Sequence, residues 1–288
     1  MSTPERIDLH VHSHCSDGTL APAALVALAV QREVQWLALT DHDTVAGCAE
    51  AASACAAAAS SGFAPRFVPG TELTCDWHGR EIHVVGLAID TAQAALATHL
   101  DGLRALRRSR LQEMGRRLQS AGLPGETLVA TILAQPNSAT RMHLARSLAA
   151  AGHVSDPEEA FERWLKRGRP GYAPAQWPTL AATVAAIGTA GGLAVLAHAQ
   201  RYQLSGGGLR DLVAHFRECG GHGIEVSLAG VSPGDADRLA SLARRFDLAG
   251  SVASDFHAPG LPWRPLGRFA KLPDGIRPIL DELRRRLP

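Results

Sequence analysis

Short β-rich runs alternate with helical runs rich in alanine and leucine, and this alternation constrains the fold of the 288-residue chain more than any other feature. Residues 6–12 and 35–40 are β-rich, and each is followed by a helical run, at 22–33 and 44–59. In such a pattern each helix carries the chain back across the sheet, so the strands it joins lie parallel. The sequence therefore predicts an α/β fold of parallel strands joined by crossover helices.

The same pattern continues to about residue 89 and returns in the last third of the chain. Asp76-Trp77-His78-Gly79 is typical of a hairpin turn between two strands. Gly206-Gly207-Gly208 is interpreted as a short loop. Five further strands bring the predicted total to seven, and they span 66–74, 81–89, 192–198, 223–228 and 250–254.

The strand signal disappears between residues 91 and 174. This stretch indicates several helices, including a long basic one at 103–121 and another at 140–151. We therefore expect two parts: a barrel formed by 1–90 together with 175–288, and an inserted helical subdomain at 91–174.

Charge and composition narrow the range of partners. A formal net charge of +1 argues against a stable complex with long nucleic acid. No apolar stretch approaches the roughly 20 residues that a membrane span requires, and the N-terminus lacks the pattern of a secretory signal. The five cysteines are odd in number and lack CxxC spacing, which favours reduced thiols. We expect a cytoplasmic protein with no membrane partner.

Histidines and carboxylates follow the predicted strands. His10 and His12 end the first strand, and residues two apart on a strand point to the same face, so both imidazoles can reach one ion. A lone histidine at a strand end is more often packed or solvated than ligating. Here, however, such residues accompany six strands, at the end where barrel enzymes place their chemistry. The nine candidate metal ligands are His10, His12, Asp17, His42, Glu72, His83, His198, Asp255 and His257.

The sequence leaves two possible roles open for each of two further acidic residues, Glu225 and Asp43. Glu225 is either an orienting group behind a ligating histidine or an ordinary charge partner. Asp43 is either a helix N-cap or a ligand.

At these residues the chain resembles the PHP (polymerase and histidinol phosphatase) family of metal-dependent phosphoesterases. The resemblance implies a distorted (β/α)7 barrel, in agreement with the seven predicted strands. The motifs that carry it are His10-Val11-His12, Ser16-Asp17-Gly18-Thr19, Thr40-Asp41-His42-Asp43, Gly70-Thr71-Glu72, His83, His198 and Ser254-Asp255-Phe256-His257.

The resemblance also implies three divalent ions, with Mn²⁺ favoured over Zn²⁺ or Fe²⁺. One ion is expected near His10, His12, Glu72 and Asp255. A second shares Glu72 with His83 and His198, and these six residues are expected to activate the attacking water. Asp17, His42 and His257 are expected to hold the third.

Within the family, the chain looks most like the branch that hydrolyses nucleotide phosphates, because it carries the runs Arg141-Met142-His143-Leu144-Ala145-Arg146 and Arg167-Gly168-Arg169-Pro170-Gly171-Tyr172. Met142 and Ala199 stand where proline is more usual. The candidate substrate-binding residues are Arg141, His143, Lys166, Arg169, Arg201 and Ser13. Surface charge pairing is the alternative role for the cationic candidates, and capping of a turn is the alternative for Ser13.

The expected function is hydrolysis of the 3′-phosphate of nucleoside 3′,5′-bisphosphates, with the inserted subdomain binding the small nucleotide. The alternative is a 5′-3′ exoribonuclease acting on short RNA. A histidinol-phosphate phosphatase is a further option that leaves the insert without a purpose. A non-catalytic nucleotide-binding protein is disfavoured because the full ligand set is present.

Overall fold

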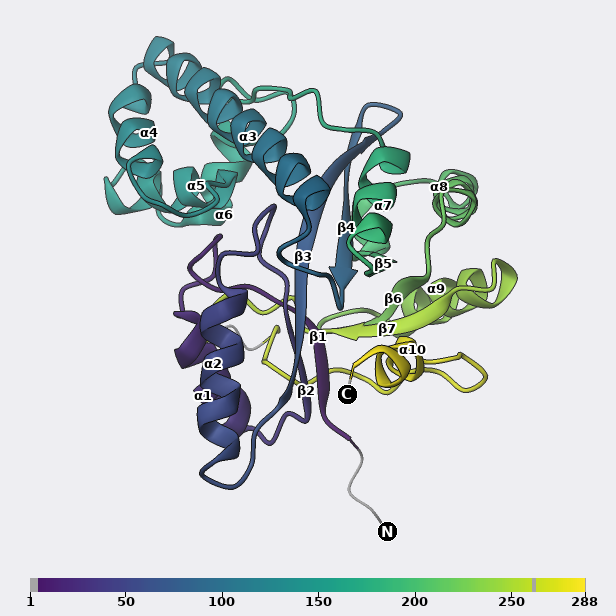
Figure 1. Ribbon diagram of the computed structural model, residues 1–288. Coiled ribbons are helices and arrows are strands. Elements are labelled where there is room, and N and C mark those ends of the chain that lie inside the picture. Colours follow the sequence, from purple (N-terminus) through teal and green to yellow (C-terminus); the bar gives the residue numbers. More distant parts are fainter. Residues whose placement is uncertain (1–4, 261–262, 288) are drawn as a thin grey trace. The chain divides into compact units, whose positions relative to one another are not determined.

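The computed structural model describes residues 5–260 and 263–287, and its chain divides into two compact units. One unit contains Met1–Leu100 and Pro178–Pro288, and the other contains Asp101–Trp177. Figure 1 traces the chain through both units. In the part of the chain that is described, no helix is both long and apolar enough to cross a membrane.

The first unit is built on a seven-stranded sheet whose strands lie side by side in sequence order. Strand β4 is antiparallel to both of its neighbours, and the other pairs are parallel. The strands are β1 (Ile7–Val11), β2 (Trp36–Leu39), β3 (Arg66–Trp77), β4 (Arg80–Leu87), β5 (Leu193–Leu196), β6 (Gly223–Leu228) and β7 (Ala249–Ala253). All seven were predicted, and the hairpin turn between β3 and β4 is confirmed, with His78 and Gly79 both at positive φ.

The sheet closes through the residues that follow β7. The His12 N–H donates to the carbonyl of Phe256 at 2.9 Å, and the Asp255 N–H donates to the carbonyl of His10 at 2.9 Å. These bonds join the last strand to the first. The predicted distorted (β/α)7 barrel is therefore confirmed, with the single antiparallel strand β4 as the main departure from a regular barrel.

Helices cover the strands of this unit (Figure 1). They are α1 (Pro22–Gln31), α2 (Cys48–Ala59), α7 (Leu180–Thr189), α8 (Gly206–Glu218), α9 (Pro233–Arg245) and α10 (Ile279–Arg286). The interpretation of Gly206-Gly207-Gly208 as a loop is wrong, because these residues form the first turn of α8. Ser205 caps that turn by accepting a hydrogen bond from the Gly208 N–H, which supplies one of the partners that a helix start lacks.

Two apolar cores hold the barrel together. Leu9, Val85 and Val195 pack in one core with Ile279 and Leu283 of α10. A second core lies around α1 and α2 and includes Val11, Leu25, Leu39 and Phe256. Leu9 and Val11 of β1 thus pack in different cores, and the pairing of β1 with β2 shifts register between Asp8 and Val11.

Every regular element among the described residues of the second unit is a helix. Its elements are most of α3 (Ala94–Ser120), then α4 (Gly125–Leu133), α5 (Arg141–Ala150), α6 (Pro157–Ala160) and the five-residue π-helix η1 (Phe161–Leu165). Leu111, Leu118, Leu144 and Leu148 belong to its own core. The unit comprises Asp101–Trp177, beside the expected 91–174, and its first boundary falls within the continuous helix α3.

Candidate metal centre

His10 and His12 form one side of a buried cluster at the end of β1. Both side chains are fully buried, and their Nε2 atoms lie 3.0 Å apart. Two nitrogens that bind one transition-metal ion at about 2.1 Å, at roughly a right angle, would be separated by about 3 Å. The pair therefore has the spacing of two ligands on one ion.

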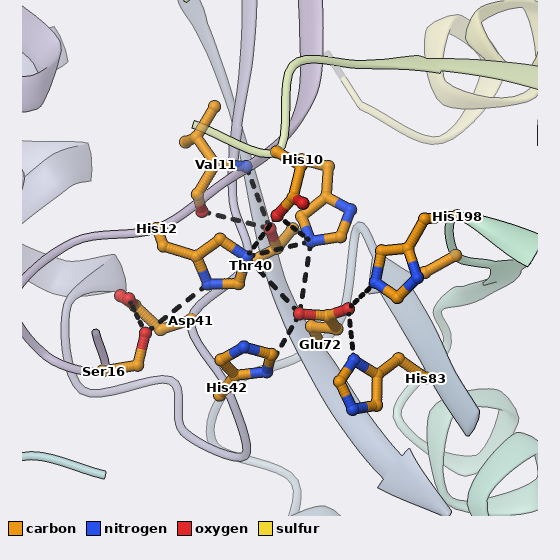
Figure 2. A network of polar contacts seen from close by, with 12 residues as sticks. His10, Val11, His12, Ser16, Thr40, Asp41, His42, Glu72, His83 and His198 are labelled. Carbon is orange, nitrogen blue, oxygen red and sulfur yellow. Dashed lines mark hydrogen bonds and ion pairs between the residues drawn. The ribbon is translucent and has the colours of Figure 1, made fainter. Parts of the chain in front are cut away.

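Glu72 lies at the centre of the cluster, and its two oxygens face different groups (Figure 2). Oε2 lies 3.3 Å from His10 Nε2, 3.4 Å from His12 Nε2 and 2.9 Å from His42 Nδ1. Oε1 lies 2.9 Å from His83 Nδ1 and 2.8 Å from His198 Nε2. A carboxylate placed in this way can bridge two ions.

The backbone around Glu72 explains this central position. Glu72 lies within the long strand β3, and the segment beyond β2 continues alongside it: the Asp43 N–H donates to the Glu72 carbonyl at 2.9 Å. This pairing brings His42 to one side of Glu72. On the other side, the antiparallel register of β3 and β4 sets His83 opposite Thr74, two residues from Glu72.

A third group surrounds Asp17. The Asp17 carboxylate lies 3.3 Å from His257 Nε2 and 3.8 Å from His42 Nε2. Asp255 connects this group to the first, because its Oδ1 lies 3.3 Å from His12 Nε2 and 3.5 Å from His257 Nδ1.

The structure thus brings all nine candidate ligands together. Ligand atoms gather into three groups suitable for a metal ion: His10, His12 and Glu72; His42, Glu72 and His83; and His12, Asp17, His42 and His257. These groups differ from the expected division among the ions in two respects. His12 and His42 each belong to two groups, and His198 and Asp255, which lie beside Glu72 and His12, belong to none of the three. Six imidazoles and three carboxylates make a mixture that suits Mn²⁺, Zn²⁺ or Fe²⁺.

Glu225 orients two residues of the cluster. His10 Nδ1 donates to Glu225 Oε1 at 2.6 Å, and the His198 N–H donates to Oε2 at 2.6 Å. Hydrogen bonding at Nδ1 turns Nε2 of His10 toward His12 and Glu72. Of the two interpretations of Glu225, the structure supports the orienting role, which is the usual partner of a ligating histidine.

Asp43 takes neither of the roles considered for it. Helix α2 begins at Cys48 with Gly47 at its N-cap position, so Asp43 does not cap it. The buried Asp43 carboxylate instead accepts hydrogen bonds from the Thr74 N–H at 2.8 Å and the Thr74 hydroxyl at 3.0 Å. It ties the His42 segment to β3.

Electrostatics in the cluster favour bound cations. Burial alone would raise the pKa values of Asp17, Glu72 and Asp255, but the surrounding histidines hold all three well below their usual range. Burial would lower the pKa of His83, yet Glu72 raises it to about 9. Burial and the charge of His257 lower the pKa of His12 to about 3. The cluster therefore combines ionised carboxylates with at least one imidazole that keeps its lone pair at neutral pH, which is a donor set for metal.

Two residues at strand ends adopt left-handed backbone conformations. Asp255, just after β7, has φ 53°, and His198, just after β5, has φ 29°. Such conformations cost on the order of 1–3 kcal/mol each outside glycine, and they concentrate at functional sites. Each residue is held by its backbone N–H, which donates to the His10 carbonyl in the case of Asp255 and to Glu225 in the case of His198.

Ser13 directly follows the ligand His12 and is fully buried. Its hydroxyl donates to Asp41 Oδ2 at 2.6 Å and accepts from the Cys15 N–H at 3.1 Å. These contacts correspond to the turn-capping role considered for it. Burial raises the pKa of Asp41 to about 6.

Four of the candidate substrate-binding residues belong to the second unit. His143 accepts from the Thr140 N–H at 3.0 Å and completes a capping box at the start of α5, while its Nε2 lies 3.1 Å from Asn137 Nδ2. The Arg141 guanidinium lies 5.9 Å from the centre of the Phe161 ring. Lys166, just after η1, pairs with Glu162 four residues earlier, and Arg169 is exposed.

Arg201, the remaining candidate, lies in the first unit. It belongs to the short 3-10 helix η2 (Ala199–Tyr202), and its guanidinium contacts Asp255 Oδ2. Arg264 reaches the same oxygen at 2.9 Å. Sequence reasoning missed Arg264, because it lies in a connecting segment away from any strand end and no motif marks it.

Comparison with known proteins agrees with this geometry. The model of the PHP domain matches residues 8–109. The 5′-3′ exoribonuclease Rnm of Escherichia coli is 42% identical over 94% of this chain and 92% of its own length. A 3′,5′-nucleoside bisphosphate phosphatase of Chromobacterium violaceum is 41% identical over 98% of this chain and 97% of its own.

Two solved structures share the fold over nearly the whole chain. An amidohydrolase from Chromobacterium violaceum, with bound sulfate and no metal, superimposes with a TM-score of 0.90 at 40% identity, covering 98% of this chain and 97% of its own. A protein from Bifidobacterium adolescentis, described as a metal-dependent phosphoesterase, has a TM-score of 0.80 at 27% identity, covering 99% and 98%.

Proposed function

Because this chain belongs to the PHP family of metal-dependent phosphoesterases and hydrolyses phosphoester bonds, we propose that it removes the 3′-phosphate from nucleoside 3′,5′-bisphosphates. The products are a nucleoside 5′-monophosphate and inorganic phosphate. The observation that carries the proposal is the cluster around Glu72, where the two oxygens of one buried carboxylate face separate sets of imidazoles.

We propose that the cluster holds three divalent ions, with Mn²⁺ as the native metal. Bound divalent ions supply hydroxide from water near neutral pH and offset negative charge on phosphoryl oxygens. The residues that would hold the ions around the attacking water are His10, His12, Glu72, His83, His198 and Asp255. Asp17, His42 and His257 would hold the remaining ion.

Two side chains that would not bind metal, those of Glu225 and Arg201, suit the site to a phosphate ester. Glu225 fixes the direction of the His10 ring, so that Nε2 stays turned into the cluster. Arg201, whose guanidinium reaches the edge of the cluster at Asp255, binds phosphoryl oxygens of the substrate. The planar arginine fork suits this role because it can meet two such oxygens at once.

In this proposal the second unit recognises the rest of the nucleotide. Arg141 and His143 of α5, with Lys166 and Arg169, bind the 5′-phosphate, and Ser13 serves the turn that follows β1. The helical unit has an apolar core of its own, which gives these side chains a folded support. The small net charge suits a mononucleotide, and the unpaired cysteines suit a reducing, cytoplasmic setting.

A second candidate function is 5′-3′ trimming of short RNA, since the Escherichia coli relative bears that name at nearly the same identity as the phosphatase. Both activities cleave a phosphoester on the 3′ side of a nucleotide whose 5′-phosphate is held. The sulfate in the Chromobacterium structure supports an anion site in this fold, and an anion site serves either substrate.

The deciding experiment compares adenosine 3′,5′-bisphosphate with short 5′-phosphorylated RNA in the presence of Mn²⁺. We expect adenosine 5′-monophosphate from the bisphosphate, and we expect Arg141→Ala to lower this activity at least tenfold while a generic phosphoester is still cleaved. Arg116→Ala, an exposed arginine paired with Glu113 on α3, serves as the matched control and should behave like wild type. Absence of bisphosphate turnover alongside trimming of RNA would replace the phosphatase with the exoribonuclease.

A further inference from the structure

Two arginines converge on one oxygen of Asp255. Arg201 and Arg264 both contact Oδ2, and the Arg264 Nη1 atom lies 2.9 Å from it. The other oxygen, Oδ1, faces His12 at 3.3 Å and His257 at 3.5 Å. Asp255 therefore separates the imidazoles of the metal cluster from a pair of guanidinium groups.

This pair of arginines lies between the buried cluster and solvent. The Asp255 side chain is 5% exposed, whereas those of Arg201 and Arg264 are 32% and 28% exposed. A ligand that approaches the cluster on this side would meet the two guanidinium groups beside the Asp255 carboxylate.

The charges and donors of the pair exceed what Asp255 can satisfy. Two guanidinium groups share one oxygen of the Asp255 carboxylate. The other oxygen of that carboxylate interacts with His12 and His257. Each guanidinium has five N–H donors, and one oxygen accepts only a few of them. The remaining N–H donors fit a tetrahedral oxyanion, which arginine binds through two oxygens at once.

We propose that Arg264 is a substrate-binding residue that, together with Arg201, grips the phosphoryl group being cleaved. The inference deepens the proposed function by adding a residue that no sequence motif marks. It also defines the ligand class at this edge of the site as a phosphate monoester or free phosphate. Arg264 keeps its contact with Asp255 on one side and donates to the phosphoryl oxygens with its remaining N–H groups.

A purely positional role for Arg264 makes a different prediction. If Arg264 only held Asp255 in place, its loss would weaken metal binding and leave the affinity for phosphate in metal-free protein unchanged. If it binds substrate, its loss weakens phosphate binding whether or not metal is present.

The test measures inorganic phosphate binding to the full chain by calorimetry, once loaded with Mn²⁺ and once after chelation. We expect Arg264→Ala to weaken phosphate binding at least tenfold in both states, and Arg264→Lys to recover part of the loss, because lysine restores charge without the fork. Arg268→Ala changes an exposed arginine four residues along the same segment, and it should bind phosphate as wild type does. Metal content of each variant, measured by elemental analysis, should match wild type.

Two results would overturn the proposal: wild-type affinity for phosphate in metal-free Arg264→Ala protein, or a loss confined to metal content. Kinetics with the bisphosphate supply a separate readout, in which we expect a raised KM and at least a tenfold lower kcat/KM. If the bisphosphate is not a substrate but Arg264→Ala still loses phosphate affinity, the proposed substrate fails while the role of Arg264 stands.

Discussion

Two carboxylates, Glu72 and Glu225, each contact different partners with their two oxygens, and these contacts organise the site. Glu72 gives one oxygen to His10, His12 and His42 and the other to His83 and His198. Glu225 accepts from a histidine ring with one oxygen and from a backbone N–H with the other. Because each oxygen has its own partner, even an isosteric amide cannot replace the carboxylate: one of its two ends becomes a donor.

We therefore predict that Glu225→Gln weakens metal binding about 10- to 100-fold, the usual effect of losing a group that orients a ligating histidine. Glutamine would set its NH₂ group against either the His10 Nδ1–H or the His198 N–H. Competition with a fluorescent chelator for Mn²⁺ measures the effect. Glu126→Gln, at an exposed position in the first turn of α4, is the control. Wild-type metal affinity in Glu225→Gln would show that the hydrogen bonds do not orient the ligands.

The turn between β1 and α1 is the element that returns Asp17 to the strand end. The Ser16 and Gly18 N–H groups donate to the Ser13 carbonyl at 3.1 and 2.9 Å, and the Ser13 and Ser16 hydroxyls both donate to Asp41. Gly18 packs so tightly that an added Cβ would lie 2.3 Å from the His12 carbonyl oxygen. The turn thus depends on a close backbone approach that only glycine allows.

Gly18→Ala should lower the free energy of unfolding by about 2 kcal/mol or more, because the methyl group meets backbone atoms that cannot move without displacing His12. Urea unfolding measures the change, and metal analysis should show a reduced metal content. Gly102→Ala is the matched control: nothing lies within 4 Å of its added Cβ in α3, so we expect a gain of about 0.5–1 kcal/mol from helix propensity. Equal stability of the two variants would contradict the close-approach argument.

At the scale of the molecule, the barrel gathers ligands from chain positions as far apart as 10 and 257. Closure of the sheet through the Phe256 and Asp255 backbone sets the end of β7 beside β1. This arrangement buries several carboxylates and imidazoles close together, which costs free energy when no metal is bound. Metal ions bind this cluster only in the folded state, so metal binding should stabilise the fold.

Removal of metal should accordingly lower the melting temperature. At an Mn²⁺ concentration 100 times Kd, the stabilisation is about 2.7 kcal/mol, which corresponds to roughly 4 to 5 °C for a chain of this size. Differential scanning calorimetry with chelator and with Mn²⁺ measures the difference. Glu72→Gln should show a much smaller response, because its amide cannot bridge two ions, and an undiminished response in this variant would argue against the central role of Glu72.

Strand-end histidines and the alternation of strands with helices predicted the seven strands and the set of residues that meet in the cluster, and the resemblance to the PHP family added the distorted barrel. Periodicity carries this information because burial of one strand face dictates which side chains turn to the other. The start of α8 at Gly206 was missed, because a capping serine outweighed the glycine run. The positions of Asp43 and Arg264 also lay beyond the sequence pattern.

Local sequence pattern therefore specifies the residues at the strand ends and the order of the elements that present them. Folding adds that His12 and His42 each belong to two groups, that Glu225 orients His10, and that Arg264 contacts Asp255. Some of these contacts join residues more than 200 positions apart in the chain, as between His10 and Glu225. Local pattern does not encode their distances, because those distances arise only when the sheet closes and packing selects one arrangement of the connecting segments.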